Sequence, residues 1–200
     1  MEITAILGVA GSVSLLAGWR LYLSILATGL AMRWGAIPLP DHLSSLAVLA
    51  DPWVMGIAGA AAVAEFFADK VMWLDSIWDA VHTLVRPVGG ALLALAIMDP
   101  ADPATQVIAF VLGGGASLAA HAGKAGARAV VNTSPEPVSN IAVSTAEDVA
   151  TAGLLYVAYE YPAIAAGVAA LLLAVVAAML IAARRVLRRL LGRDRRRTQP

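Results

Sequence analysis

The stretch QVIAFVLGGGASLAAHAGKAGARAVV, residues 106–131, decides the class of protein. It is long enough to cross a bilayer and almost wholly apolar, yet it contains His121, Lys124 and Arg128. At 100° per residue these three side chains fall within about 60° of one another on one helix face. Inside a membrane such side chains are destabilising unless they face a protein interior or a wet cavity. The sequence therefore predicts a membrane helix whose cationic face lines a buried polar site.

The composition of the whole chain also indicates a membrane protein. Of its 200 residues, 60% are hydrophobic and 14% are charged, whereas soluble domains have about 45–50% and 25%. Cysteine is absent, which excludes disulfides and thiolate chemistry. The sequence also lacks the motifs of helical zinc proteases, nucleophile-elbow hydrolases and P-loop proteins. The standard hydrolase and nucleotide-driven classes are therefore not indicated.

Apolar stretches separated by proline-rich breaks predict an all-α, polytopic membrane fold with about six spans. The second and third stretches are short for a bilayer, so whether they cross it fully is left open. The spans are expected at residues 3–34, 52–67, 87–98, 105–131, 139–160 and 163–183.

Residues 69–86 differ from these spans because they are amphipathic. One arc of the helix is apolar, and the opposite face carries Asp75, Asp79, His82 and Arg86. Two tryptophans suit the headgroup region, so we expect this helix to lie along the membrane surface or to cap a cavity. The i, i+4, i+7 spacing of Asp75, Asp79 and His82 would also allow a divalent metal site. A solvated polar face with local ion pairing is the favoured interpretation.

A shift of 95 positions aligns features of the two halves of the chain. Arg33 then coincides with Arg128, and Glu65 with Glu160. Chance is the alternative explanation, because alanine and valine are abundant. Three spans in each half would give the halves opposite orientations, which is the inverted-repeat plan of many secondary transporters. We therefore predict a 3+3 inverted repeat.

The last residues of the chain are strongly basic. Of the 14 lysines and arginines, eight lie within residues 184–200. Such a run can bind nucleic acid, but directly after an apolar span it is better interpreted as an anchor beside anionic lipid. Six spans then place both termini in the cytoplasm of a bacterial inner-membrane protein. The predicted organisation is a first repeat (1–98), a second repeat (104–183) and a cytoplasmic tail (184–200).

The basic side chains of the fourth span need acidic partners, and the predicted spans supply several. If these acids only pair with the bases, the polar site holds helices together; if they face a pathway, they bind or conduct a solute. The candidate substrate-binding or ion-pathway residues are His121, Lys124, Arg128, Glu65, Glu147, Asp148 and Glu160.

Three motifs carry a resemblance to a known family: FADK at residues 67–70, WDAVHTLVRP at 78–87 and NTSPEP at 132–137. They resemble a bacterial family of integral membrane proteins that is catalogued as a domain of unknown function. The similarity would extend over most of the chain except the arginine-rich tail. The resemblance implies a membrane protein and adds no mechanism.

Three functions remain open at this point. The first is a transporter or channel for a small anionic solute or lipid headgroup. The second is a structural or assembly membrane protein without transport. The third, less favoured, is a metal-dependent enzyme acting on a lipid, so an enzymatic role is not the preferred interpretation. No cofactor or nucleic acid is expected. The expected partners are the bilayer, anionic lipid at the tail and a small anionic solute, with a homo-oligomer left open.

Overall fold

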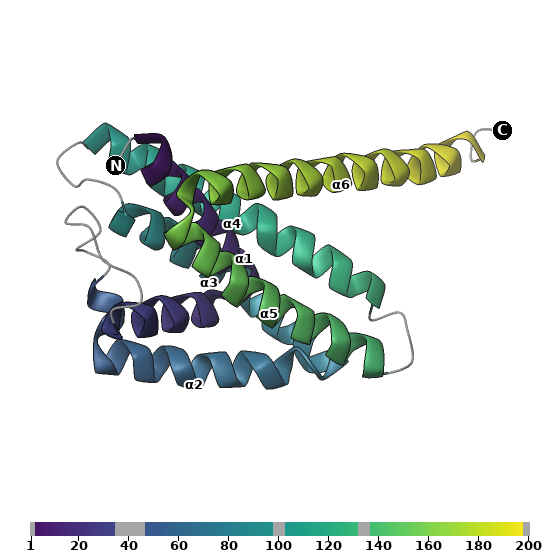
Figure 1. Ribbon diagram of the computed structural model, residues 1–200. Helices are drawn as coiled ribbons and strands as arrows, with labels where there is room; N and C mark the ends of the chain where they lie inside the picture. Colours follow the sequence, from purple (N-terminus) through teal and green to yellow (C-terminus); the bar gives the residue numbers. More distant parts are fainter. Residues whose placement is uncertain (1–2, 35–46, 98–102, 132–136, 198–200) are drawn as a thin grey trace.

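The computed structural model describes residues 3–34, 47–97, 103–131 and 137–197, and these ranges contain helices and no strand (Figure 1). The prediction of an all-α fold is confirmed. The helices are α1 (Ile3–Arg33), α2 (Pro52–Ala68), α3 (Met72–Ile97), α4 (Pro103–Val131), α5 (Pro137–Glu160) and α6 (Pro162–Arg197).

Proline and aspartate mark where the helices begin. Four of them, α2, α4, α5 and α6, have proline as their first residue, where the missing N–H would have had no helical partner. Before α2, the Asp51 carboxylate accepts hydrogen bonds from the N–H groups of Trp53 (2.8 Å) and Val54 (3.3 Å). Tyr161 alone joins α5 to α6. These local signals fix the helix starts that the apolar pattern leaves undefined.

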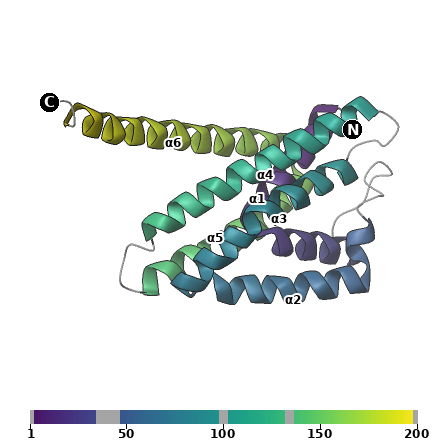
Figure 2. The same ribbon diagram turned by 180° about the vertical axis from the view of Figure 1, so that it is seen from behind.

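The first helix folds back on itself. Arg20 has φ −142° and ψ 78° inside α1, so the helix is broken into two arms. Both arms reach the corner between α5 and α6. On the first arm, a side chain at Gly8 would lie 2.8 Å from the Pro162 carbonyl oxygen; on the second, the Thr28 and Tyr159 hydroxyls are 3.0 Å apart. Figures 1 and 2 show the resulting hairpin, with its tip inside the bundle.

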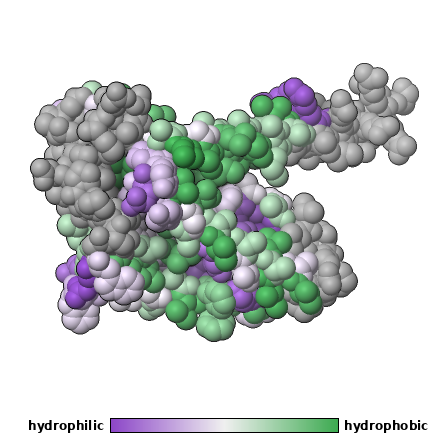
Figure 3. All heavy atoms as spheres, viewed as in Figure 1, coloured by the Kyte–Doolittle hydropathy of each residue, from purple (hydrophilic) through white to green (hydrophobic). Residues whose placement is uncertain are grey.

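The first arm of α1 forms the centre of the bundle. Val9, Val13 and Leu16 are at most 2% exposed and belong to the largest apolar core. Outward-facing side chains on the surrounding helices are large and apolar, as expected of a lipid-facing surface (Figure 3). Five stretches are long and apolar enough to cross a membrane, and α2 is shorter: Gly8–Leu30, Trp73–Ile97, Pro103–Ala129, Ile141–Glu160 and Pro162–Ala182. The chain is therefore a membrane-spanning helical protein.

Two glycines allow α4 to pack closely against its neighbours. A Cβ added to Gly18 of α1 would lie 2.8 Å from the Ala120 Cβ, and one added to Gly113 would lie 2.5 Å from the Ala94 Cβ of α3. Small residues at such positions let helix backbones approach each other in membranes. They hold α4 where its polar residues meet those of α1 and α3.

The predicted surface helix over residues 69–86 is not a separate element. A single helix, α3, continues through Pro87 and includes most of this segment together with the stretch expected at 87–98. Residues 73–97 are long and apolar enough to form one span. The short third stretch therefore joins the amphipathic segment, which supplies the length that it lacks.

The orientation of α3 also differs from that of a surface helix. Its polar face is buried, with Asp75 at 1% and Arg86 at 0% exposure, whereas its apolar face is exposed, with Trp73 at 65% and Leu84 at 78%. A helix lying on the membrane surface would turn its polar face towards water. A span in lipid shows the reverse pattern, because only the protein interior offers partners for charged groups.

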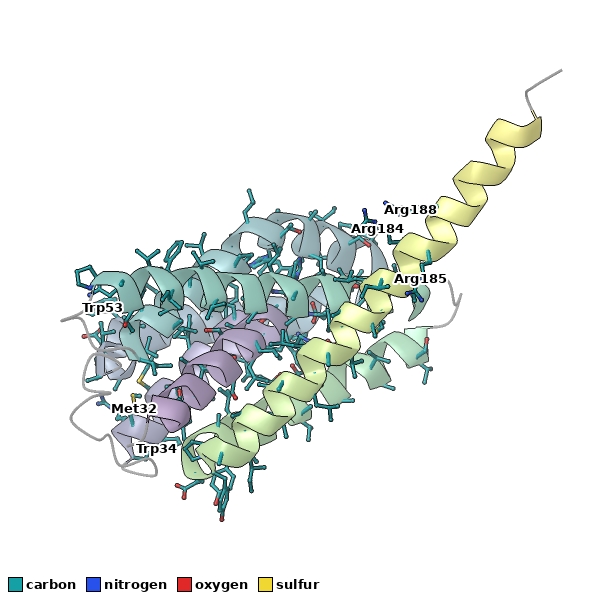
Figure 4. The ribbon with its side chains drawn as sticks, turned by 90° about the horizontal axis from the view of Figure 1, so that it is seen from above. Met32, Trp34, Trp53, Arg184, Arg185 and Arg188 are labelled. Carbon is teal, nitrogen blue, oxygen red and sulfur yellow. The ribbon has the colours of Figure 1, made fainter. Side chains whose placement is uncertain are left out.

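The two ends of the described chain lie at opposite ends of the bundle (Figures 1 and 2). Arg184, Arg185 and Arg188 are exposed on the part of α6 that extends beyond the other helices, and Trp34 and Trp53 lie at the other end (Figure 4). The first helix enters the bundle and returns, so its two ends lie on the same side of the bundle. The location of both termini in the cytoplasm stays a prediction.

The residues paired by the predicted internal repeat have different surroundings. Glu65 is 1% exposed whereas Glu160 is exposed, and Arg128 is 1% exposed whereas Arg33 is exposed. The inverted repeat, with its division into residues 1–98 and 104–183, therefore stays a prediction.

Candidate functional site

A network of charged side chains occupies the interior of the bundle. It has two parts, which we call the Asp69 cluster and the Arg86 cluster. The Asp69 cluster comprises Asp69, Arg20, Lys124, Arg128, Glu147 and Asp148, and the Arg86 cluster comprises Arg86, Glu65, Asp79 and His121.

Asp69 is the anionic centre of the first cluster. Its carboxylate follows the end of α2 and is 0% exposed. One oxygen, Oδ2, lies 2.9 Å from Lys124 Nζ and 3.4 Å from Arg128 Nη2, and it also pairs with Arg20 Nη1. Burial alone would raise the pKa of Asp69, but the Lys124 ammonium and the Arg20 guanidinium hold that pKa below its ordinary value. Asp69 is therefore a carboxylate that binds three cations at once.

Arg20 connects the tip of the α1 hairpin to α5. It is 1% exposed, and its Nε lies 3.1 Å from Asp148 Oδ1 while its Nη2 lies 3.5 Å from Glu147 Oε2. The same Nη2 donates hydrogen bonds of 3.0 Å to the carbonyl and hydroxyl oxygens of Ser144. The break in α1 thus occurs at the residue whose side chain links three segments of the protein.

Lys124 contacts oxygens from three segments. Its ammonium donates hydrogen bonds to Asp69 Oδ2 at 2.9 Å and to the Trp19 carbonyl oxygen at 3.3 Å. Glu147 Oε2 is 3.7 Å away. Trp19 is the last residue before the break, so its carbonyl lies at the negative end of the dipole of the first α1 arm. The ammonium is therefore held by two carboxylates and one helix terminus.

The Arg86 cluster is built around a guanidinium that is 0% exposed. Arg86 Nη2 donates to Glu65 Oε1 at 2.7 Å, and Nη1 donates to Asp79 Oδ1 at 3.0 Å and to His121 Nδ1 at 2.7 Å. The Thr83 hydroxyl donates to the Asp79 carbonyl oxygen, so it accepts from His121 Nε2–H at 3.1 Å. Since Nδ1 accepts and Nε2 donates, the His121 imidazole is neutral in this arrangement.

The two clusters are neighbours along the bundle, and we call them together the network. Glu65 and Asp69 are four residues apart at the end of α2, and His121 and Lys124 are three apart on α4, so each pair shares a helix face. Arg86 lies near the middle of α3, and Lys124 lies in the C-terminal half of α4. Figure 3 shows hydrophilic atoms in the middle of one face, beneath α6.

A groove of about 270 Å³ between α3 and α4 adjoins the Arg86 cluster. Its polar lining consists of Asp75, Ser76, Asp79, Thr83 and His121, and small alanines complete it. The groove contains carboxylates and no lysine or arginine among its described lining residues. It is therefore a polar approach to the network, and its two carboxylates lie against arginines, with Asp79 3.0 Å from Arg86 and Asp75 3.9 Å from Arg128.

The structure does not bring Asp75, Asp79 and His82 together as metal ligands. Asp79 binds Arg86, while His82 donates from Nδ1 to the Trp78 carbonyl oxygen at 2.7 Å and accepts at Nε2 from the Tyr22 hydroxyl at 3.0 Å. Among the described residues no group of three histidine or acidic side chains is placed to hold a metal. The metal site therefore stays a prediction, and the contacts of Asp79 and His82 do not favour it.

Most of the residues that the sequence singled out meet in this network. His121, Lys124, Arg128, Glu65, Glu147 and Asp148 belong to it, whereas Glu160 is exposed at the far end of α5. Sequence reasoning missed Arg20, Asp69 and Arg86. Arg20 could have been found as a lone arginine in an apolar helix. Asp69 could have been found from its spacing of four residues from Glu65. Arg86 was assigned to a solvated face, since hydrophobic periodicity does not tell an inward polar face from an outward one.

The comparisons with known proteins agree with the membrane class. The family model described as Domain of unknown function (DUF4126) matches residues 7–182. This match confirms the resemblance found in the sequence, and it ends before the basic tail. No curated protein and no solved structure matches the chain. The chain belongs to the DUF4126 family of proteins of unknown function.

Proposed function

We propose that this protein is a transporter or channel that moves a small ion through its buried charged network. The observation that carries the proposal is Arg20, which lies 1% exposed at the tip of a broken, folded-back helix among charges from other segments. Broken helices within membranes are tolerated where they are buried in protein or line a cavity. In secondary transporters their ends contribute to solute and ion sites.

The energetics of the network support a functional role. Buried ion pairs lose hydration that their mutual attraction only partly replaces, so apolar side chains of similar size often stabilise a protein better. A protein that only needed to hold its helices together would not require so many charges. Charged residues inside membranes commonly mark ion and substrate pathways.

A structural or assembly role is the second candidate. It is favoured by the close pairing of the network, since Arg86 binds Glu65 at 2.7 Å and Lys124 binds Asp69 at 2.9 Å. In that case the ion pairs specify how the helices pack and no solute enters. The two candidates differ in whether the network is wet and conducts.

The partners of His121, Lys124 and Arg128 in the structure are our reason for favouring one sign of ion over the other. His121, Lys124 and Arg128 alone favour an anionic solute or lipid headgroup. In the network, Lys124 and Arg128 lie against carboxylates, His121 is neutral, and the described lining of the adjoining groove contains Asp75 and Asp79 but no lysine or arginine. We therefore favour a cation over the anion that the sequence suggested.

We place the protein in a bacterial inner membrane, with the arginine-rich tail in the cytoplasm beside anionic lipid. The exposed Arg184, Arg185 and Arg188 support this, because basic residues are enriched on the cytoplasmic side and bind anionic headgroups. If α1 re-enters the membrane without crossing it, the N-terminus would then face the periplasm.

Ion flux into proteoliposomes tests the proposal. Purified protein is reconstituted, and the uptake of sodium, potassium, ammonium, protons and chloride is followed separately. We expect wild type to conduct a cation and Glu147→Gln to reduce its flux roughly tenfold or more, because a lost charge-assisted hydrogen bond is worth about 1.5–3 kcal/mol. Glu160→Gln is the matched control, since Glu160 is exposed and outside the network.

Two results would count against transport. One is the absence of flux for every ion with wild-type protein that is folded and correctly inserted. The other is an equal loss of flux in Glu147→Gln and Glu160→Gln, since the network would then have no special part in conduction. Flux of chloride alone would restore the anion hypothesis.

A further inference from the structure

We propose that the oxygen atoms around Lys124 Nζ form a binding site for a small monovalent cation, an alkali ion or ammonium, for which the Lys124 ammonium is the built-in competitor. The inference rests on the proposed function, because the bound cation would be the one that is transported. We call the site the Lys124 cage, defined by oxygens of Asp69, Glu147 and Trp19.

The geometry of the cage resembles that of a cation site. Asp69 Oδ2, the Trp19 carbonyl oxygen and Glu147 Oε2 lie 2.9, 3.3 and 3.7 Å from Lys124 Nζ. Carboxylate and backbone carbonyl oxygens are the ligands that hard cations prefer. The carbonyl comes from the end of a broken helix, where half-helix C-terminal ends coordinate cations in transporters.

A further acceptor belongs to the same carboxylate. Asp69 is 0% exposed, and its second oxygen, Oδ1, accepts no hydrogen bond from the described part of the chain. Buried carboxylate oxygens are normally satisfied by donors or by a cation. The carboxylate therefore has an oxygen available for a cation that can approach it more closely than a tethered ammonium.

The charges of the surroundings also favour a cation. Around the cage, Arg20, Lys124 and Arg128 face the carboxylates of Asp69, Asp75, Glu147 and Asp148. Lys70, whose ammonium donates to the Ser144 hydroxyl that also binds Arg20, balances the fourth acid, so displacement of the Lys124 ammonium leaves an excess of negative charge. Because uncompensated buried charge is strongly destabilising, another cation must replace the ammonium when Lys124 leaves.

Lysine is suited to such an exchange. Its ammonium is a compact charge on a flexible stem, whereas an arginine would hold both carboxylates in a fixed fork. Gly123 directly precedes Lys124 and Gly126 follows two residues later; a Cβ added to Gly126 would meet nothing within 4 Å, whereas one added to Gly123 would lie 2.9 Å from Val176 Cγ2. In the proposed cycle a cation that enters the cage displaces the ammonium, which returns when the cation leaves.

Thermal unfolding of purified Lys124→Met in detergent tests the site. The chlorides of sodium, potassium, ammonium and N-methyl-D-glucamine are compared at equal ionic strength. We expect a small cation to raise the melting temperature of Lys124→Met saturably, with no effect of the bulky N-methyl-D-glucamine. Wild type should respond much more weakly, because its own ammonium occupies the cage.

Two further variants act as controls. Adding Asp69→Asn to Lys124→Met should abolish the cation response, because it removes the closest ligand. Lys70→Met should not create a response, since Lys70 lies outside the cage and contacts Phe66 and Ser144. Lys124→Gln is a second variant for the same measurement in case Lys124→Met does not fold, because the glutamine amide can still donate a hydrogen bond to Asp69.

Equal responses of wild type and Lys124→Met would overturn the site. So would failure of both Lys124→Met and Lys124→Gln to fold in every small cation, because no cation would then replace the ammonium. A saturable response without any flux in proteoliposomes would keep the site and overturn the transport proposal. Flux without a cation response of Lys124→Met would keep the transport proposal and overturn the site.

Discussion

Arg86 shows how strongly the interior depends on single side chains. Its guanidinium is fully buried and lies between Glu65 at 2.7 Å and Asp79 at 3.0 Å. Removing one partner of a buried ion pair leaves an uncompensated charge, which is far more destabilising than replacing the whole pair. The stability of this part of the protein should therefore depend on the balance of charge more than on packing volume.

Arg86→Met tests this dependence. We expect it to lower the free energy of unfolding by about 3–5 kcal/mol, because Glu65 and Asp79 lose their counter-charge. Adding Glu65→Gln should recover part of the loss. Denaturant unfolding in detergent measures both changes, and the exposed Arg184→Met should change the free energy by less than about 0.5 kcal/mol. A double variant no more stable than Arg86→Met would show that charge is not the cause.

The destabilising effect of unpaired charge in a membrane also explains what the sequence could predict about the site. The sequence alone identified Lys124 as a residue that needs an acidic partner, and Glu147 is one of the contacts of Lys124. It did not identify Asp69, the nearest partner, because the turn after α2 carries no apolar periodicity to fix its direction. Pairing between distant segments depends on tertiary packing, which a single sequence does not encode in its local pattern.

At the scale of elements, the fold-back of α1 sets the position of the network. A straight helix of this length would continue across the bundle and would not end its first arm at Arg20, beside Asp69 and Ser144. The break instead places the end of the first arm beside Lys124 and returns the second arm to Tyr159. The fold class, most helix ranges and the breaks could be read from apolar stretches and prolines. The direction of the second α1 arm could not, since both arms are equally apolar.

The fold-back predicts the location of the termini. If α1 enters the membrane and returns, the helices α2 to α6 cross it an odd number of times, and the two termini face opposite sides. Fusions of green fluorescent protein and of alkaline phosphatase to each terminus report the cytoplasm and the periplasm. We expect the fusion at Pro200 to report the cytoplasm, because the tail is basic, and the fusion at Met1 to report the periplasm.

Reporters on the same side at both ends would mean that α1 crosses the membrane. Removing the basic residues of the tail serves as a control. If orientation depends on them, that variant should change the location of the C-terminus in at least part of the population, while the relation between the two termini stays the same.

At the scale of the whole molecule, the protein has an apolar exterior and an interior in which a charged network lies beside an apolar core. The network extends from Asp79 and Glu65 to Arg128 and Asp148 and draws on α1 to α5. A pathway and a purely structural network can share this arrangement, but they differ in water content. Ions cross only where water or the solute itself reaches the charged groups.

The reactivity of a single thiol tests most directly whether the network is such a pathway. The chain contains no cysteine, so one substitution provides the only thiol. Ser144 and Val13 are both 0% exposed, but Ser144 binds Arg20 in the network, whereas Val13 lies in the apolar core. Proteoliposomes with Ser144→Cys or Val13→Cys are treated with a small, positively charged, water-soluble methanethiosulfonate. We predict that Ser144→Cys is modified, more slowly when the transported cation is present, and that Val13→Cys is not. Failure to modify Ser144→Cys, or equal modification of both, would contradict a pathway through the network.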